Sequence, residues 1–351
     1  MFENLYVMRL GAVAPTAGRE CSPFGRRSPG GQTAMALPRE DAAGSSVALA
    51  VLTYRRSAEL ERILPELIEQ ARSIRPPARV MVIDNDPDAG ARATADRWSS
   101  DGLEYYHEPT PGIAAGRNRA LDEADDCSAL VFIDDDEMPT EGWLGQLVAA
   151  WQDTAADAVA GPVQRVFDGD VDPWVLASGV FDRRTRPTGT AIGGAATSNL
   201  LLDLATLRLL GLRFDHRFGI TGGSDTRITH DLVGRGGRIV WCDEAEVLDL
   251  VPAARASRRW VLQRTFRTGN VWSRVGIDLA SRGWPRLRSR VGYVALGLRL
   301  VLQGAAQVIW GAIRLDEGRR ARGSTRVMSG AGVGCGAVGY VYTEYHRGKA
   351  T

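Results

Sequence analysis

Four consecutive carboxylates, Asp134 to Glu137, are the residues whose type and spacing point most directly to chemistry. They follow an apolar run of strand length that ends at Ile133. Adjacent carboxylates repel one another unless a cation neutralises them. Hard cations such as Mn²⁺ or Mg²⁺ bind carboxylate oxygens together with substrate phosphates. The cluster therefore predicts a metal and diphosphate site, although acidic turns of this kind also occur as solvated loops.

Polar residues also end two other apolar runs. Thr53 and Tyr54 stand at the end of the run 47–53, and Asp84 ends the run 79–84. In open α/β sheets, ligands gather at the carboxyl ends of the strands. These positions are therefore candidates for one shared ligand site. The alternative is that the aspartates and asparagines there only make turns.

Apolar runs of strand length alternate with helical periodicity from residue 47 onward. This alternation predicts an α/β, Rossmann-like fold, in which a mostly parallel sheet is covered by helices on both faces. Pro65 lies within the first helical pattern, so that helix should start late or kink. The predicted strands are 47–53, 79–84, 104–107, 129–133, 158–161 and 238–241, and the predicted helices are 60–71, 114–124 and 142–151.

Five short motifs occur in a fixed order along the chain. They are Ala-Val-Leu-Thr-Tyr-Arg-Arg (50–56), Val-Ile-Asp-Asn-Asp (82–86), Pro-Gly-Ile-Ala-Ala-Gly-Arg-Asn-Arg-Ala (111–120), Phe-Ile-Asp-Asp-Asp-Glu (132–137) and Gly-Gly-Ser-Asp-Thr (222–226). Together they resemble a family 2 glycosyltransferase with a GT-A fold, and in particular the succinoglycan-type exopolysaccharide glycosyltransferases. The resemblance covers residues 47–270. It implies an enzyme that transfers a hexosyl group from a nucleoside-diphosphate sugar (NDP-sugar), usually a UDP-sugar.

The resemblance assigns most of the donor site. Asp134 and Asp136 match the outer positions of the family's DxD motif, whose last aspartate holds the Mn²⁺ or Mg²⁺ ion that bridges the diphosphate. Asp135 and Glu137 are then turn or supporting residues. The resemblance also implies further donor-binding residues. Thr53 and Tyr54 match the nucleotide pocket, and Asp84 matches the contact with the base. Gly112, Arg117 and Asn118 match the nucleoside side of the site.

Asp225 is the candidate catalytic base. A helix that starts at its motif would favour the ionised carboxylate through the helix dipole, and an ionised carboxylate can accept a proton from an acceptor hydroxyl. The family usually has glutamate where Ser224 stands, so the acceptor contact of that glutamate is in doubt. Asp225 could instead be a plain helix cap. The segment 258–260, Arg-Arg-Trp, loosely resembles the family's Arg-Trp element near the diphosphate; alternatively, Trp260 anchors a core beside surface arginines.

Charge is distributed unevenly in this 351-residue chain. Residues 251–351 hold 18 arginines and lysines against four aspartates and glutamates, a net charge of +14, whereas the whole chain has +1. Such a region suits an anionic surface. Residues 291–313 could span ~30 Å of hydrocarbon as a helix, but Arg299, Gln303 and Gln307 share one face and favour an interfacial position. We therefore expect the membrane surface and no nucleic acid as partner; a helical pair packed on the catalytic domain is the alternative.

The composition divides the chain into four parts. Residues 1–46 show no sustained period and are predicted to be disordered or an over-extended start. Residues 47–160 form the nucleotide-sugar-binding half and 161–255 the acceptor-binding half. Residues 256–351 form a basic, amphipathic helical region, in which a second shallow helix falls at 329–342. Four widely spaced cysteines argue against a zinc site or a disulfide framework. We expect a cytoplasmic enzyme, peripheral on the inner face of the membrane.

These features predict an inverting, metal-dependent glycosyltransferase. The expected acceptor is a glycan or a polyprenyl-diphosphate-linked oligosaccharide, which follows by analogy. One alternative is a sugar-nucleotide nucleotidyltransferase, which should carry a glycine-rich loop where Thr-Tyr-Arg-Arg stands here. A second is a catalytically inactive NDP-sugar-binding protein, against which the presence of Asp134, Asp136 and Asp225 speaks.

Overall fold

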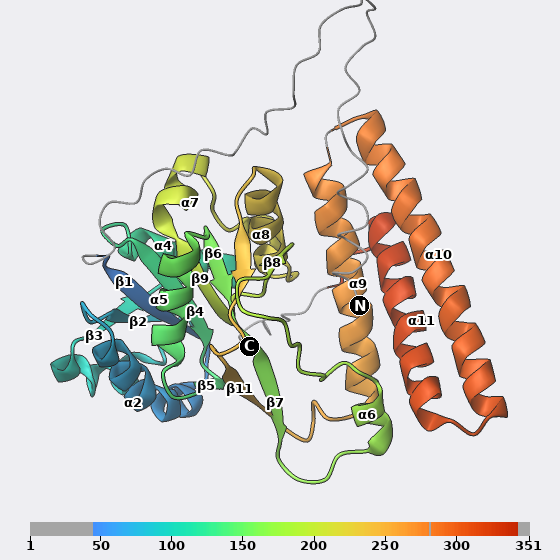
Figure 1. Ribbon diagram of the computed structural model, residues 1–351, viewed down its shortest axis with the longest axis horizontal. Coiled ribbons are helices and arrows are strands. Elements are labelled where there is room, and N and C mark those ends of the chain that lie inside the picture. Colours follow the sequence, from blue (N-terminus) through green and yellow to red (C-terminus); the bar gives the residue numbers. More distant parts are fainter. Residues whose placement is uncertain (1–44, 281, 343–351) are drawn as a thin grey trace, which may run out of the picture. The chain divides into compact units, whose positions relative to one another are not determined.

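The computed structural model describes residues 45–280 and 282–342, so the segment 1–46, predicted to be disordered, lies outside the described residues except for its last two. The central sheet has eight strands (Figure 1). In spatial order they are β3 (Leu103–His107), β2 (Arg79–Asp84), β1 (Val47–Thr53), β4 (Ala129–Asp134), β9 (Asn199–Asp203), β6 (Ala158–Ala160), β10 (Ile239–Trp241) and β8 (Ala191–Ile192).

Most neighbours in this sheet are parallel. Strands β3, β2, β1 and β4 run parallel to one another, and β6 runs parallel to β10. Strand β9 lies antiparallel between β4 and β6, and β8 is antiparallel to β10. The predicted mostly parallel sheet is therefore confirmed. The antiparallel β9 follows the glycine-rich segment 193–194, and its apolar side chains are buried.

A smaller sheet continues directly from the acidic turn. It consists of β5 (Glu137–Pro139), β11 (Val247–Val251) and β7 (Val163–Phe167), in the order β5-β11-β7. Because β4 ends at Asp134 and β5 begins at Glu137, only two aspartates separate these two strands of the different sheets. No sequence pattern predicts these strands: β5 is three residues long, and charged side chains interrupt the other two.

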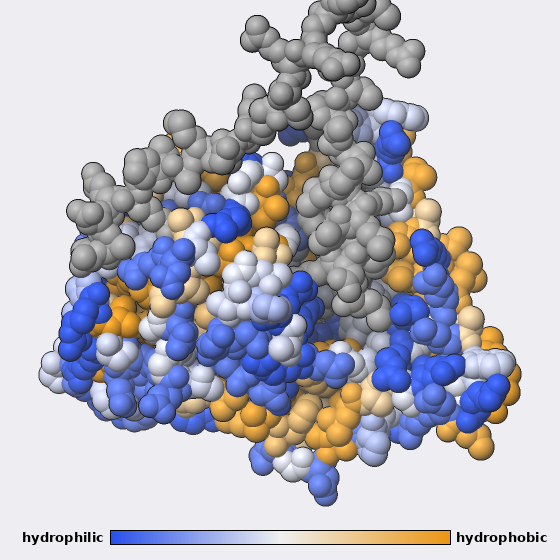
Figure 2. Space-filling model, in the orientation of Figure 1, coloured by the Kyte–Doolittle hydropathy of each residue, from blue (hydrophilic) through white to orange (hydrophobic). Residues whose placement is uncertain are grey.

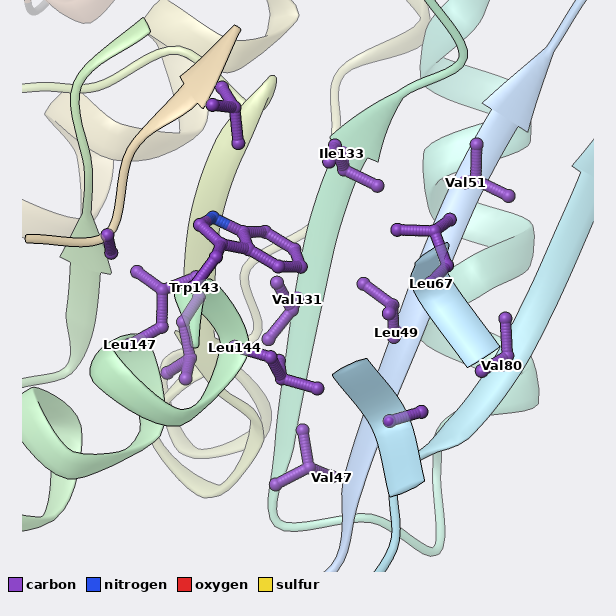
Figure 3. Close-up of a cluster of buried hydrophobic side chains, with 14 of the residues drawn as sticks. Val47, Leu49, Val51, Leu67, Val80, Val131, Ile133, Trp143, Leu144 and Leu147 are labelled. Carbon is purple, nitrogen blue, oxygen red and sulfur yellow. The ribbon is translucent and has the colours of Figure 1, made fainter. Parts of the chain in front are cut away.

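Alternate residues of β1 face two different helical layers. Val47, Leu49 and Val51 point into the core that Figure 3 shows, whereas Ala48 and Ala50 belong to the core on the opposite face. Burial on both faces explains the continuous apolar run and confirms the predicted helices on both faces. The first layer holds α2 (Ser57–Ser73), α3 (Arg92–Asp96) and α5 (Trp143–Thr154), and the second holds α4 (Ile113–Glu123), α7 (Leu204–Leu210) and α8 (Ser224–Gly234).

Helix α2 begins at Ser57 and runs through Pro65, so the prediction of a late start is wrong. Pro65 has no amide hydrogen to donate to the carbonyl oxygen of Glu61. Both residues are exposed, and solvent can bind that carbonyl. The buried stripe on the other side, which includes Leu60, Leu64 and Leu67, keeps the helix against the sheet.

Helices α9 (Arg258–Leu279), α10 (Trp284–Ile313) and α11 (Glu317–Ala337) end the described chain. Helix α11 packs against both α9 and α10 (Figure 1), and α9 also contacts α8. Helix α11 begins much earlier than the predicted segment 329–342 because Asp316 caps it, accepting a hydrogen bond from the amide of Arg319 at 2.8 Å. By length and composition, α10 is the one helix in the described ranges that could cross a membrane.

Glycines let the backbones of α10 and α11 touch. A Cβ atom added at Gly330 would lie 2.6 Å from the carbonyl oxygen of Gly297, and one added at Gly304 would lie 2.7 Å from that of Gly323. Real Cβ atoms do not approach so closely, so side chains at these positions would push the two helices apart. The high glycine content of α11 therefore reflects close helix packing.

Two glycines four residues apart on α11 make this packing testable. We expect Gly330→Ala to lower the free energy of unfolding by ~1–3 kcal/mol, because the new methyl group overpacks the contact with α10. Gly334→Ala should raise it by ~0.5–1 kcal/mol, since no atom lies within 4 Å of the added methyl and alanine favours a helix. Urea unfolding measures both variants, and shifts of the same sign would contradict the packing.

Candidate active site

The carboxyl ends of three parallel strands bring the first candidate residues together. Thr53 of β1 pairs in register with Asp84 of β2, and Leu52 of β1 pairs with Asp134 of β4. The three strand ends therefore lie side by side at one edge of the sheet (Figure 1). This is the edge at which α/β sheets bind ligands.

Asp135, the middle residue of the acidic turn, is held by neighbouring side chains. Its carboxylate accepts a hydrogen bond from Thr53 Oγ1 at 2.8 Å and one from Arg56 Nη1 at 3.0 Å. Burial raises the pKa of Asp135 to about 6, an effect that Arg56 and Thr53 oppose. Thr53, which was expected to line the nucleotide pocket, is itself buried, and its hydroxyl donates its hydrogen bond to this turn.

Asp136 and Asp134 differ in their surroundings. Asp136 Oδ2 lies 2.8 Å from Arg56 Nη1 and 3.3 Å from Arg255 Nη1. The carboxylate of Asp134 accepts no hydrogen bond from any residue in the described part of the chain. Burial raises its pKa to about 6; Arg117 counteracts the shift, and the two following aspartates add to it. Asp134 therefore keeps unused oxygen lone pairs.

Arg117 connects this acidic turn to helix α8. Its Nη1 donates a hydrogen bond to Ser224 Oγ at 2.7 Å, and both residues are buried. Its guanidinium carbon lies 5.5 Å from the centroid of the Phe214 ring. Because Ser224 immediately precedes Asp225, one buried cation joins Asp134 to the start of the helix that carries the candidate base.

Two more candidate donor residues tie the same segments together. The side-chain amide of Asn118 donates to the carbonyl oxygen of Phe214 and accepts from its amide, both at 2.9 Å. Gly112 has φ of +111° and lies so close to Gly219 that an added Cβ would be 3.2 Å from the Gly219 carbonyl carbon. In the structure these residues position the segment before α8, and the side chain of Asn118 is only 6% exposed.

Asp225 lies in the first turn of α8. The N-cap is Gly223, with φ of +97°, and no side chain caps this helix end. The alternative that Asp225 is the cap is therefore wrong. Its Oδ1 accepts from the amide of Thr226 at 2.7 Å, and the side chain is half-buried. One turn later, burial lowers the pKa of His230 to about 4, so this histidine is neutral near Asp225.

Asp84 is fully buried, and its carboxylate is engaged within the chain. It accepts hydrogen bonds from the amides of Asp86 and Ala91, each at 2.9 Å, and from Tyr105 Oη at 2.8 Å. These bonds shape the loop after β2, and burial keeps the carboxylate away from solvent. Tyr54, by contrast, is half-buried at the end of β1.

The structure also identifies residues that the sequence reasoning missed. Arg56 and Arg255 both contact Asp136. The sequence analysis assigned no role to Arg56, although it belongs to the first motif. Arg255 follows β11 and lies in no recognisable motif. In contrast, Arg258 pairs with Asp172 and Glu317 at the surface. Trp260 stacks on Phe181 and joins a small core, so the alternative of a core anchor holds for Trp260.

The donor set at the turn suits a hard divalent cation. Asp134 and Asp136 offer carboxylate oxygens, and Asp134 has no competing hydrogen bond from the described residues. Within the described ranges, no group of three histidine, cysteine or acidic side chains is arranged to hold a metal alone. Mg²⁺ and Mn²⁺ commonly take one or two carboxylates and complete their shell with phosphates and water, so two protein ligands fit.

The fold and site define a class of α/β enzymes that bind ligands at the carboxyl ends of a mostly parallel sheet. The model of the family described as "Glycosyl transferase family 2" matches residues 49–206. Succinoglycan biosynthesis protein ExoM of Rhizobium meliloti (strain 1021) is 33% identical over 318 residues, which are 86% of this chain and 96% of that protein. The chain belongs to glycosyl transferase family 2, and it is a glycosyltransferase.

Two solved structures are also similar, each with 12% sequence identity and a TM-score of 0.45. One, GalNAc-T7 with UDP, GalNAc and Mn²⁺, matches over 67% of this chain and 51% of its own. The other, S. aureus TarS 1–349, matches over 79% of this chain and 89% of its own. The family assignment rests on the sequence match along nearly the whole relative.

Proposed function

We propose that the chain is an inverting, metal-dependent glycosyltransferase that moves a sugar from an NDP-sugar to a glycan or lipid-linked acceptor. The observation that carries this proposal is the bridge through Arg117. Arg117 donates a hydrogen bond to Ser224, the residue before Asp225, and its charge acts on Asp134, whose carboxylate accepts no hydrogen bond from the described residues. The relative named for succinoglycan biosynthesis supports a role in cell-surface polysaccharide synthesis.

In this proposal the acidic turn holds the donor's diphosphate. Asp134 and Asp136 would hold Mn²⁺ or Mg²⁺, which supplies positive charge to the leaving diphosphate. Asp135 keeps the turn in shape through Thr53 and Arg56. Arg255, at the outer side of Asp136, adds a second positive charge facing the phosphates. The nucleoside, a uridine in our proposal, would lie against Tyr54.

Asp225 acts as the base in the transfer. The acceptor hydroxyl oxygen forms a bond to the anomeric carbon as the bond from that carbon to the diphosphate oxygen breaks, which inverts the configuration. The hydroxyl proton goes to the carboxylate of Asp225, and the electron pair leaves with the diphosphate. Placement in the first turn of α8 favours the ionised carboxylate before the reaction. Neutral His230 leaves Asp225 without a competing cation on its own helix face.

The alternatives make different predictions. A nucleotidyltransferase would join a sugar phosphate to a nucleotide and release pyrophosphate, and it has no use for a base on α8. An inactive binding protein would bind a UDP-sugar without hydrolysing or transferring it. The carboxylates of the turn and the hydrogen bond from Arg117 to Ser224 favour a working transfer site over both.

We further propose that α10 binds the cytoplasmic membrane surface as a peripheral element. Figure 2 shows an apolar surface along the outer side of α10. Its residues recur every three or four positions, so they form one stripe along the helix. The exposed members of the stripe are Trp284, Leu287, Val291, Val294, Leu298, Leu302, Ile309 and Ile313.

The rest of α10 argues for lying on the membrane. Its opposite face, with Gly297 and Gly304, packs on α11. Arg299 lies near the middle of the helix on the flank between these two faces, and a spanning helix would place this charge near the centre of the bilayer. Exposed Arg288 and Arg314 lie on the same flank and can contact anionic headgroups.

The metal site is tested through UDP binding. We expect Asp136→Ala and Asp134→Asn to remove Mn²⁺-dependent UDP binding and sugar transfer, because the carboxylates hold the cation that offsets diphosphate charge. Asp135→Asn should retain most UDP binding, since its carboxylate faces Thr53 and Arg56. Calorimetric titration with and without Mn²⁺ measures this. Full transfer activity of the EDTA-treated wild type would contradict the metal proposal.

The base is tested by a matched pair of substitutions on one helix. Asp225→Asn keeps size but cannot take a proton, so we expect a loss of ~10²–10⁴-fold in the transfer rate with UDP affinity unchanged. Asp231→Asn removes the same charge two turns further along α8 and should leave the rate within a few-fold of wild type. Near-normal turnover of Asp225→Asn would refute the role of Asp225 as the base. A parallel loss of UDP binding would show that Asp225 binds the donor instead.

The membrane surface is tested with vesicles of phosphatidylglycerol and phosphatidylcholine. We expect the full-length protein to sediment with them at low salt and to be released as salt rises. Leu298→Gln with Leu302→Gln should weaken binding at least about tenfold, because two apolar side chains no longer enter the interface. Leu209→Gln, at an equally exposed leucine on α7, is the control. Unchanged sedimentation of the double variant, or wild type that resists alkaline extraction, would contradict a peripheral α10.

A further inference from the structure

Asp278, near the end of α9, forms ion pairs with arginines from three other elements. Arg217, in the 3₁₀ helix η3 (His216–Phe218), donates to both of its carboxylate oxygens, at 3.0 and 2.9 Å. Arg227 of α8 lies 3.3 Å from the carboxylate, and Arg286 in the first turns of α10 lies 3.5 Å from it. The side chain of Asp278 is only 13% exposed. This carboxylate therefore joins α8 to the C-terminal helices at a largely buried point.

Helix α9 presents one face to the start of α8. Val271, Val275 and Asp278 are four and three residues apart, so they share that face. Gly223, the N-cap of α8, packs on the two valines. Arg227, four residues after Gly223, pairs with Asp278. The start of α8 thus contacts α9 at two points, one apolar and one ionic.

These two contacts determine where the proposed base points. Successive residues of a helix are turned by about 100° around its axis. Asp225 comes two residues after Gly223 and two before Arg227, so it lies on the opposite side of α8 from both. Rotation of α8 about its axis therefore moves the carboxylate of Asp225. Gly223 has no side chain that interlocks with the valines, so the ion pair of Arg227 is the contact that resists this rotation.

Arg227 has two acidic partners with different consequences. Asp231 lies 3.1 Å away, one turn further along the same helix, and a pair within α8 moves with the helix. Asp278 belongs to α9 and is itself held by the paired hydrogen bonds from Arg217. Arg227 is only 19% exposed, so solvent screens its ion pairs weakly. The pair with Asp278 is thus the one that ties α8 to a second element.

We propose that Asp278 is a positioning residue for sugar transfer. Through Arg227 it fixes the rotation of α8, and with it the direction of the Asp225 carboxylate. This inference rests on the proposed function, in which Asp225 is the base. Misplacement of a reacting group by ~1 Å can cost ~10²-fold in rate. Loss of Asp278 should therefore lower turnover without weakening donor binding, because the acidic turn lies on other elements.

The first readout, amide hydrogen exchange over residues 222–232 of the full-length protein, needs no substrate. We expect Asp278→Asn and Arg227→Gln to speed exchange there at least about fivefold, because the start of α8 opens more often. Asp231→Asn, which removes the partner of Arg227 within α8, is the matched control and should change exchange by about twofold or less. If Asp278→Asn fails to fold by circular dichroism, Arg227→Gln carries the test, since it keeps the other ion pairs of Asp278.

The second readout is release of UDP from UDP-glucose, UDP-galactose or UDP-N-acetylglucosamine with Mn²⁺, where water replaces the acceptor. We expect Asp278→Asn to lower kcat by ~10–10²-fold and to leave KM unchanged. Asp278→Glu should recover part of kcat, and Asp231→Asn should resemble wild type. The double variant Asp278→Asn with Arg227→Gln should be no slower than the slower single variant, because both changes remove one contact.

Several results overturn the proposal. Faster exchange with unchanged kcat makes Asp278 a structural residue only, and lower kcat with unchanged exchange means that it does not act through α8. Additive losses in the double variant, or a higher KM in place of a lower kcat, also contradict it. If wild type releases no UDP, or Asp225→Asn releases it equally fast, the proposed function fails. The exchange of Asp278→Asn against Asp231→Asn still shows whether Asp278 holds α8.

Discussion

The placement of one buried arginine decides how this site is built. Arg117 extends from α4 between the acidic turn and the start of α8; it donates a hydrogen bond to Ser224 and acts on Asp134 through its charge. A buried cation is costly unless it is paired, so the segments around it are held close. Asn118 and Gly112 add backbone contacts to Phe214 and Gly219 from the same turn. The segments around α4 and α8 are therefore joined beside the acidic turn.

Serine at position 224 is a consequence of this arrangement. A glutamate there would place a full negative charge against Arg117 and neutralise it. Serine accepts the same hydrogen bond without charge, so Arg117 keeps its positive charge toward Asp134. The departure from the family pattern thus changes the electrostatics of the acidic turn, although it lies on α8.

Sequence patterns were sufficient for the large sheet. Strands β1, β2 and β4 are buried on both faces, so their continuous apolar runs marked their limits to within a residue. Sequence patterns did not predict the small sheet, because β5, β7 and β11 are short and carry the charged residues Glu137, Arg165 and Asp249 on a buried face. The turn at Asp134 was visible because four carboxylates in a row are rare. The contact of Arg255 with Asp136 was not, since it joins residues more than 100 positions apart. The first part of helix α11 was not predicted because its glycines, which allow close packing, are unfavourable in helices and weaken the helical sequence pattern.

The contact between Gly223 and α9 has a consequence for how the chain can be divided. Gly223 fits against Val271 and Val275, which also contact Phe218, so the start of α8 rests on α9, a helix from the basic C-terminal region. A boundary at residue 256 would cut through one cooperative unit. Shortening the protein to its sugar-nucleotide domain would leave the proposed base on an unsupported helix end, and the minimal active fragment must extend through α9.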